Sequence, residues 1–142
     1  MTWTCDDWNK KAYMRWAGAR VLLSEGGRSR VELQVQEHHR GAAGGAAVNG
    51  AMLAYLHDVA QGAAIRSLLG SDVRAFVTLN LNVSYTALMM ADKVLLCDGR
   101  AVRVGSAVAF GESDFRDERG EVCCHATGTF RILRNRPSRV EK

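Results

Sequence analysis

Proline is almost absent from this sequence, in which Pro137 is the only one among 142 residues. Because proline removes a hydrogen-bond donor from a sheet, its absence leaves the strand-like segments of the second half uninterrupted. Long apolar runs are also missing, and none approaches the roughly 18–20 residues that a membrane-spanning helix needs. The first eleven residues contain two acidic side chains and no hydrophobic stretch, unlike a secretory signal. We therefore expect no membrane partner.

Cysteine is present, but without a spacing that suits a metal or a disulfide framework. The cysteines form no CxxC pair, and the adjacent two lie on a predicted strand, where neighbouring side chains point to opposite faces. His38, His39 and His125 show no ligand spacing either. The sequence thus favours a reducing cytoplasm and predicts neither a metal site nor a cofactor. The cysteines are Cys5, Cys97, Cys123 and Cys124.

Positive charge is concentrated at the end of the chain. The net charge is +4, and residues 131–142 hold five basic side chains against Glu141 alone. Such a segment can bind an anionic ligand, although solvated chain ends of this composition are common. It is too short and too poor in aromatic residues to indicate nucleic-acid binding.

The first half of the sequence predicts a short helix, a hairpin and one long helix. Residues 6–17 have the spacing of an amphipathic helix. Residues 19–35 resemble a β-hairpin turned by two glycines. A connection rich in glycine and alanine, 38–48, precedes a helix over 50–69, for which Asn49 is a suitable N-cap.

The second half predicts an antiparallel meander. Apolar and polar residues alternate over 74–88, which indicates a strand with Thr78, Asn80 and Asn82 on its polar face. Further strands are predicted over 92–98, 101–115 and 120–133, with turns at Gly99–Arg100 and around 117–120.

Together these elements predict an α+β domain, in which a curved antiparallel sheet wraps a single long helix. The length is that of one domain. We place this domain at 19–133, between an N-terminal helical segment, 1–18, and a basic tail, 134–142.

Asp58 is the one acidic residue in the long helix, which is otherwise apolar on nearly every side. An uncompensated buried carboxylate costs several kcal/mol or must stay protonated. Asp58 therefore has either a chemical role or a hydrogen-bonding role, such as a contact with a neighbouring chain at a dimer interface.

The helix and the strands after it resemble the hotdog-fold thioesterases of the phenylacetate-pathway (PaaI-like) and four-hydroxybenzoyl-CoA type. The resemblance covers about residues 19–133. In that family the central helix begins with a His-Gly-Gly turn and carries an acidic residue nine positions after the histidine. Here Asn49-Gly50-Ala51 stands at the turn, with asparagine in place of histidine, and Asp58 stands at the acidic position. Further matches are Gly62 and Ala64 in the helix, Ala91-Asp92 at a turn that is usually Gly-Asp and preceded by proline, and Gly120, Cys124, Thr129 and Phe130 near the end.

The resemblance implies a hotdog fold whose chains pair their sheets edge to edge as homodimers, often assembled into homotetramers. It implies an acyl-CoA substrate lying in a tunnel at the dimer interface. The acid comes from the helix of one chain, and the opposite chain contributes residues from the strand after that helix.

Hydrolysis of a thioester needs an attacking group and a donor that stabilises the oxyanion. Asp58 is a candidate general base or a candidate nucleophile, and the sequence does not choose between the two. The backbone N–H of Gly50 is the candidate oxyanion donor, because it lies at the positive end of the helix. Asn49 is either a second donor or a simple N-cap.

The remaining candidates would bind substrate. Thr78 matches a position that in relatives carries a hydroxyl positioning the water, and Asn80 and Asn82 are expected to line the same face. Arg100 and Arg103 are candidates for the phosphates of coenzyme A, since a guanidinium matches phosphate oxygens.

Two other functions fit the same architecture. The first is a non-catalytic hotdog protein that binds acyl-CoA or acyl chains. The second is a hydratase or dehydratase, which would need an Asp-His pair converging on the substrate. His57 is adjacent to Asp58, but consecutive residues of a helix diverge by about 100°. We therefore expect His57 at the surface or at an interface.

Overall fold

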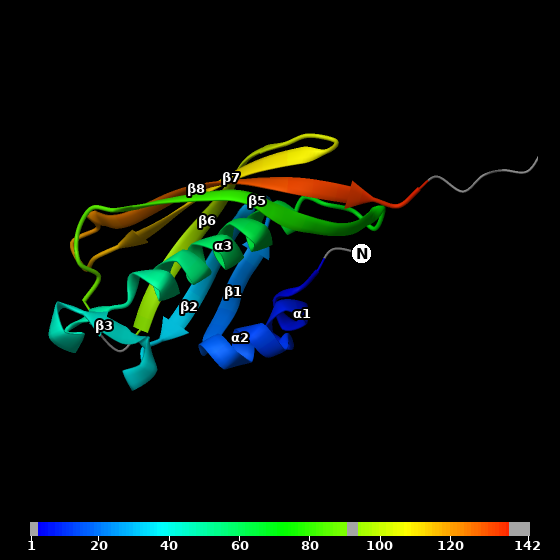
Figure 1. Cartoon of the computed structure of the whole chain (residues 1–142). Helices are drawn as coiled ribbons and strands as arrows, with labels where there is room; N and C mark the ends of the chain where they lie inside the picture. The colour runs from blue at the N-terminus through cyan, green and yellow to red at the C-terminus, as the bar shows by residue number, and fades with distance from the viewer. Residues whose placement is uncertain (1–2, 91–93, 137–142) are drawn as a thin grey trace, which may run out of the picture.

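A curved antiparallel sheet wraps one long helix in the computed structural model, which describes residues 3–90 and 94–136. The sheet has six strands in the order β1-β2-β6-β7-β8-β5, and α3 (Gly50–Arg66) lies in its concave face (Figure 1). The predicted α+β hotdog fold is therefore confirmed. The strands are β1 (Ala19–Glu25), β2 (Arg28–Gln34), β5 (Val73–Tyr85), β6 (Val94–Val104), β7 (Val108–Arg116) and β8 (Val122–Arg134).

Two short helices precede the sheet where one was predicted. α1 (Cys5–Asn9) begins with a capping box between Thr4 and Asp7, and α2 (Ala12–Ala17) ends at Gly18, whose φ is 73°. The prediction of one helix over 6–17 was wrong because Lys11 is extended, with ψ of 136°. Both helices pack against β1 (Figure 1).

The hairpin of β1 and β2 is confirmed. Gly26 and Gly27 both have positive φ, 58° and 79°, which is the conformation that a two-residue hairpin turn requires. The connection that follows contains two short 3-10 turns, η1 (Glu37–His39) and η2 (Ala43–Gly45), and two short paired strands, β3 (Arg40–Ala42) and β4 (Ala47–Val48).

The meander was predicted only in part. β6, β7 and β8 follow one another as expected, but β5 pairs with β8 at the edge of the sheet. The predicted turn at Gly99–Arg100 is wrong, because β6 runs through it and the chain turns at 105–107 instead. A Cβ at Gly99 would collide with the carbonyl of Ala60 and the hydroxyl of Ser29, so this glycine lets α3 approach the sheet. Residues 92–93 of the predicted strand, and the Ala91-Asp92 turn, lie outside the described residues.

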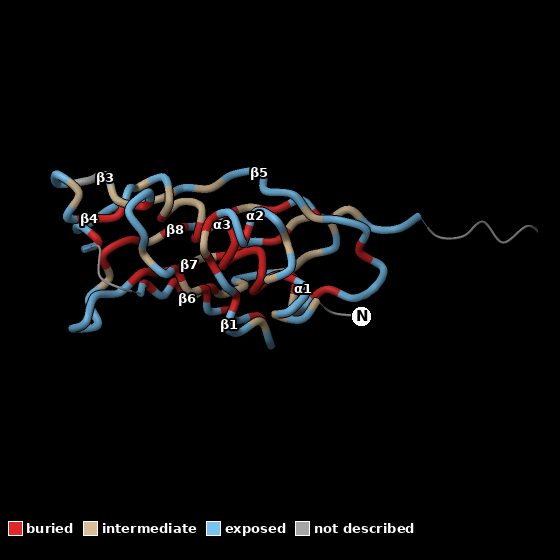
Figure 2. Tube along the Cα trace, turned by 90° about the horizontal axis from the view of Figure 1, so that it is seen from below, coloured by how far each residue is buried: buried red, intermediate tan, exposed pale blue. Residues whose placement is uncertain are grey.

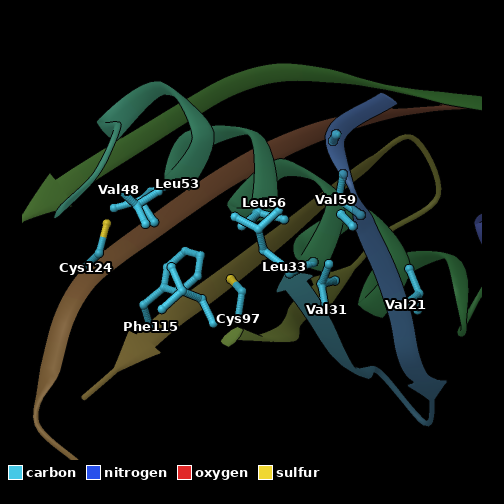
Figure 3. Packing of buried hydrophobic residues seen from close by; sticks show 14 of the residues in the cluster. Val21, Val31, Leu33, Val48, Leu53, Leu56, Val59, Cys97, Phe115 and Cys124 are labelled. Atoms are coloured by element: carbon cyan, nitrogen blue, oxygen red, sulfur yellow. The ribbon is translucent and has the colours of Figure 1, made fainter. Parts of the chain in front are cut away.

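The core lies between α3 and the sheet. Leu53, Leu56 and Val59 of the helix pack on Leu33 and Phe115 of the strands (Figure 3). Buried residues run along α3 and the strands around it (Figure 2). In the part of the chain that the structure describes, no helix is long and apolar enough to cross a membrane.

His57 is part of this core, which contradicts its expected place at the surface or at an interface. It is fully buried, with Nδ1 at 2.7 Å from the hydroxyl of Ser113 and Nε2 at 3.1 Å from the Sγ of Cys124. Gln61, one turn along the helix, donates to the same Ser113 hydroxyl at 2.9 Å. Burial, helped by the nearby His125 and opposed by Asp114, lowers the pKa of His57 to about 4. His57 is therefore a neutral core residue at neutral pH.

Acidification from pH 6.5 to pH 4 is expected to lower the free energy of unfolding by about 3 kcal/mol through His57. In this pH range His57 binds a proton in the unfolded chain but stays largely neutral in the folded chain. Urea unfolding at a series of pH values measures the slope of the free energy of unfolding against pH. His57→Asn should reduce it, leaving the part due to His39, whose pKa burial also lowers. The exposed His38→Asn is the control, and equal slopes for all three proteins would contradict the assignment.

Candidate active site

Asp58 is held by a side chain and not by peptide groups. It is half-buried in the middle of α3, and Thr78 of β5 donates its hydroxyl proton to Oδ1 of Asp58 at 2.6 Å. Among the described residues nothing donates a hydrogen bond to Oδ2. One oxygen is thus fixed while the other is available to a ligand or to water.

A bulge in β5 brings Thr78 to Asp58. Thr78 pairs with Phe130 and Asn80 with Thr129, so Leu79 is an extra residue without a partner. A bulge of this kind reverses the alternation of side chains along the strand. Thr78 therefore faces α3.

Asn80 and Asn82 consequently lie on the opposite face from Thr78. Beyond the bulge it is Leu81 and Val83 that face inward: Leu81 pairs with Gly128, which lies against Gln61 of α3, and Val83 packs on the core. The expectation that Asn80 and Asn82 line the face of Thr78 was wrong.

A cavity of about 580 Å³ lies beside Asp58 and Thr78. Its walls are largely aromatic, and they come from the N-terminal segment as well as from α3 and the sheet. The aromatic residues are Trp3, Trp8, Tyr13, Tyr55, Phe76 and Phe130. An apolar cavity with a few polar groups at one end is the usual form of a small-molecule site.

The N-terminal segment is fastened to this cavity. Tyr55 of α3 donates its phenolic proton to the backbone carbonyl of Tyr13 in α2 at 2.8 Å. Burial raises the pKa of both tyrosines, and the negative charge of Asp58 adds to each shift. Sequence reasoning missed these walls; the only signal was the aromatic content of the first seventeen residues.

The N-terminus of α3 leaves one backbone donor free. Asn49 accepts a hydrogen bond from the N–H of Ala51 on its side-chain oxygen at 2.8 Å, which makes it the N-cap. Its backbone carbonyl accepts from the N–H groups of Met52 and Leu53. In the described parts of the chain the N–H of Gly50 has no acceptor. The predicted oxyanion donor is thus the free N–H at the positive end of the helix.

Gly50 lies under the ring of Tyr85. The Tyr85 hydroxyl donates to the carbonyl of Gly50 at 2.7 Å, and a Cβ at Gly50 would lie 3.3 Å from the ring. Contact with Tyr85 is thus a reason for glycine here that the sequence did not reveal.

One chain does not bring Gly50 and Asp58 to a single substrate atom. The two residues are eight positions apart on the same helix, which separates them by about 12 Å along its axis. Both would have to lie about 3 Å from the reacting carbonyl group. Within one chain, Gly50 and Asp58 therefore cannot both act on the same carbonyl group.

Arg100 and Arg103 lie away from the cavity. Arg100 follows Gly99, which faces α3, so its side chain is on the outer face, where it pairs with Glu112 at 2.9 Å and with Asp114 at 2.8 Å. Arg103 is exposed on the same outer face, opposite Phe110. The arginines that line the cavity are Arg66 and Arg74, which sequence reasoning missed.

Comparison with known proteins agrees with this geometry. A family model described as the thioesterase superfamily matches residues 45–124, more than half of the chain. The chain belongs to the thioesterase superfamily.

Individual relatives are similar over different spans. A Halobacterium salinarum protein named as a candidate esterase is 38% identical over 95 residues, which cover 62% of this chain and 62% of that protein, less than two thirds of its length. A conserved protein of Pseudomonas aeruginosa has a TM-score of 0.78 at 28% identity, covering 87% of this chain and 94% of its own. A thioesterase of Haemophilus influenzae shares the fold at a TM-score of 0.82 and 13% identity, covering 98% and 96%.

Thr78→Val should lower kcat for thioester hydrolysis between about 10- and 100-fold, the range expected for losing a hydrogen bond to a charged group. Valine keeps the shape of threonine but cannot orient the carboxylate. Thr78→Ser keeps the hydroxyl and is the matched control, with activity near wild type. Equal activity of the valine and serine variants would contradict the role of this hydrogen bond.

Proposed function

We propose that the protein hydrolyses an acyl-CoA thioester to a free acid and coenzyme A, as the PaaI-like and four-hydroxybenzoyl-CoA thioesterases do. The observation that carries the proposal is the carboxylate of Asp58, fixed through one oxygen by Thr78 and open at the other, on the wall of an apolar cavity. The cysteines of the protein are free thiols, which fits a cytoplasmic location.

The chemistry assigned to Asp58 takes one of two forms. As a general base, Asp58 accepts a proton from water while the water oxygen bonds to the carbonyl carbon. The C–S bond then breaks, and the proton passes to the leaving thiolate. As a nucleophile, the carboxylate displaces the thiolate to give a mixed anhydride, which water hydrolyses. In both forms the Gly50 N–H stabilises the oxyanion.

A second copy of the chain is part of the proposed site. The distance of about 12 Å between Gly50 and Asp58 supports it, because two antiparallel copies can place Gly50 of one beside Asp58 of the other. The edge of the sheet also supports it. β5 is thirteen residues long and carries exposed apolar side chains, Val77 and Leu79 among them. An unpaired edge of this kind readily pairs with another strand. We propose a homodimer through β5, with further assembly into a homotetramer.

The phosphates of coenzyme A lie outside the cavity in this proposal. Arg103, which is exposed, stays a candidate for them. Arg100 does not, because its guanidinium is engaged by two carboxylates.

A non-catalytic acyl-CoA-binding protein is the second candidate. It is favoured by Asn49, which replaces the family's histidine and uses its side-chain oxygen as a helix cap. Thiol release from short-chain, aromatic and long-chain acyl-CoAs distinguishes the two functions. Binding by calorimetry with no thiol release from any of them would favour the second.

Asp58→Asn and Asp58→Ala should lower kcat/KM about 100-fold or more, because each removes the attacking or proton-accepting group. The same thiol-release assay measures the loss, and circular dichroism checks the fold. Asp6→Asn, at an exposed aspartate far along the chain, is the matched control. Label found in Asp58 after a single turnover in ¹⁸O-labelled water would identify the nucleophilic form, with water attacking the aspartyl carbon of the anhydride. Unchanged turnover in the Asp58 variants would refute the assignment.

Gly50→Pro should lower kcat about 100- to 1000-fold by removing one N–H. Proline is tolerated at the first position of a helix, and Asn49 already has the extended ψ of 131° that a residue before proline needs. Gly50→Ala has the same crowding of Tyr85 but keeps the N–H, so it should retain most of the activity. Equal losses in the two variants would show that crowding and not the N–H is responsible.

Mixing the inactive Gly50→Pro and Asp58→Asn proteins tests the second copy. If Asp58 and Gly50 of one site come from different chains, random exchange of subunits should restore about a quarter of the wild-type activity. Each mixed dimer then has one intact site. No recovery after refolding the mixture would place both groups in one chain.

A further inference from the structure

A buried arginine lies at the far end of the same cavity. Asp58, Gly62 and Arg66 are spaced four residues apart on α3, so they follow one another along one side of the helix, and all three line the cavity. Arg66 is eight residues from Asp58, about 12 Å along the helix axis. Its side chain leans back toward the N-terminus of the helix, as helical side chains do, and so toward Asp58.

Arg66 has no carboxylate partner in residues 3–90 and 94–136. Only 7% of its surface is exposed, and its Nε is buried without a hydrogen-bond acceptor. Its guanidinium lies 5.3 Å from the ring centre of Trp3. Burial lowers the pKa of Arg66, although an arginine stays charged. A buried cation without an anion is unfavourable, so an anionic ligand that pairs with the guanidinium of Arg66 would be stabilised.

A second buried donor borders the same cavity. The indole Nε1 of Trp8 is also without an acceptor among the described residues. Buried polar groups are normally hydrogen-bonded, so two such groups at one cavity indicate a missing acceptor.

The space between Asp58 and Arg66 suits a flat group. A Cβ at Gly62 would lie 3.5 Å from the ring of Phe76 and 3.7 Å from that of Trp8. The space beside Gly62, here called the slot, is thus bordered by two aromatic side chains. A planar or aromatic group can stack there, and a larger residue at 62 would fill the slot.

We propose that the acyl group ends in a carboxylate that binds Arg66, while its planar or aromatic middle occupies the slot between Trp8 and Phe76. The substrate class is then the CoA thioester of a dicarboxylic acid. The inference rests on the proposed function, because it takes the thioester carbonyl to lie beside Asp58. Charge supports the orientation: the anionic Asp58 meets the neutral carbonyl end, and the cationic Arg66 meets the anionic end.

The test compares matched acyl-CoAs with and without a terminal carboxylate: 4-carboxyphenylacetyl-CoA with phenylacetyl-CoA, and adipoyl-CoA with hexanoyl-CoA. Wild type should prefer the carboxylated member of each pair at least 10-fold in kcat/KM. Arg66→Met should abolish this preference by lowering kcat/KM only for the carboxylated substrate. Arg66→Lys should restore part of the preference. Arg20→Met, at an exposed arginine of β1, removes the same charge and should leave the preference intact.

Three results would overturn the inference. The first is equal hydrolysis of both members of each pair by wild type, which would leave thioester hydrolysis itself established. The second is an equal fall in kcat/KM for both members of a pair in Arg66→Met, which would assign Arg66 to a phosphate of coenzyme A. Thioesters of N-acetylcysteamine, which lack phosphates, check this by keeping the preference only if Arg66 binds the acyl carboxylate. The third is a marked fall in melting temperature for Arg66→Met, since removing an unpaired buried charge should leave it unchanged or raised.

Absence of any thioester hydrolysis would refute the proposed function, and binding then decides the inference alone. Tryptophan fluorescence follows it, because Trp3 and Trp8 border the cavity. 4-Carboxyphenylacetamide should bind at least 10-fold more tightly than phenylacetamide, and Arg66→Met should remove the difference. Equal binding of the two amides by wild type would overturn the inference.

Discussion

The close approach of α3 to the sheet is the constraint on which the rest of the structure depends. The strands present glycine where the helix is nearest: a Cβ at Gly99 would collide with the carbonyl of Ala60, and one at Gly128 with the side chain of Gln61. The hydroxyl of Ser29 donates to the same Ala60 carbonyl. The helix cannot roll without breaking these contacts, so its rotation about its own axis is fixed.

Fixing that rotation divides the polar residues of α3 into two sets. His57 and Gln61 face the sheet and meet at Ser113, where they form a buried network. Asp58 is about 100° further round, so it points away from the middle of the sheet and meets the hydroxyl of Thr78 on the edge strand β5. Adjacent residues of one helix therefore have unlike surroundings: His57 lies in the core, and Asp58 lies on the wall of the cavity. His57 and Asp58 therefore cannot converge on one substrate.

What the sequence predicted well was local. The hairpin followed from two glycines and the helix start from an N-cap asparagine. Apart from the break at Lys11, the failures depended on contacts between distant segments. The bulge at Leu79 exists because of the register between β5 and β8, and it alone places Asn80 and Asn82 away from Thr78. Gly99 is a residue type typical of turns, but in the structure it lies in a strand and contacts α3.

Asn49 shows how a departure from the family pattern can preserve the part of the site that matters. The start of a helix has four backbone N–H groups to satisfy. Asn49 satisfies that of Ala51 with its side chain, and its carbonyl satisfies those of Met52 and Leu53. The N–H of Gly50 remains. The cap by Asn49 thus satisfies the N–H groups that follow Gly50. The N–H of Gly50 itself stays unbonded among the described residues, at the positive end of the helix dipole. Asparagine in place of the family's histidine thus changes the side chain at the turn, while the N–H of Gly50 keeps its position at the positive end of α3.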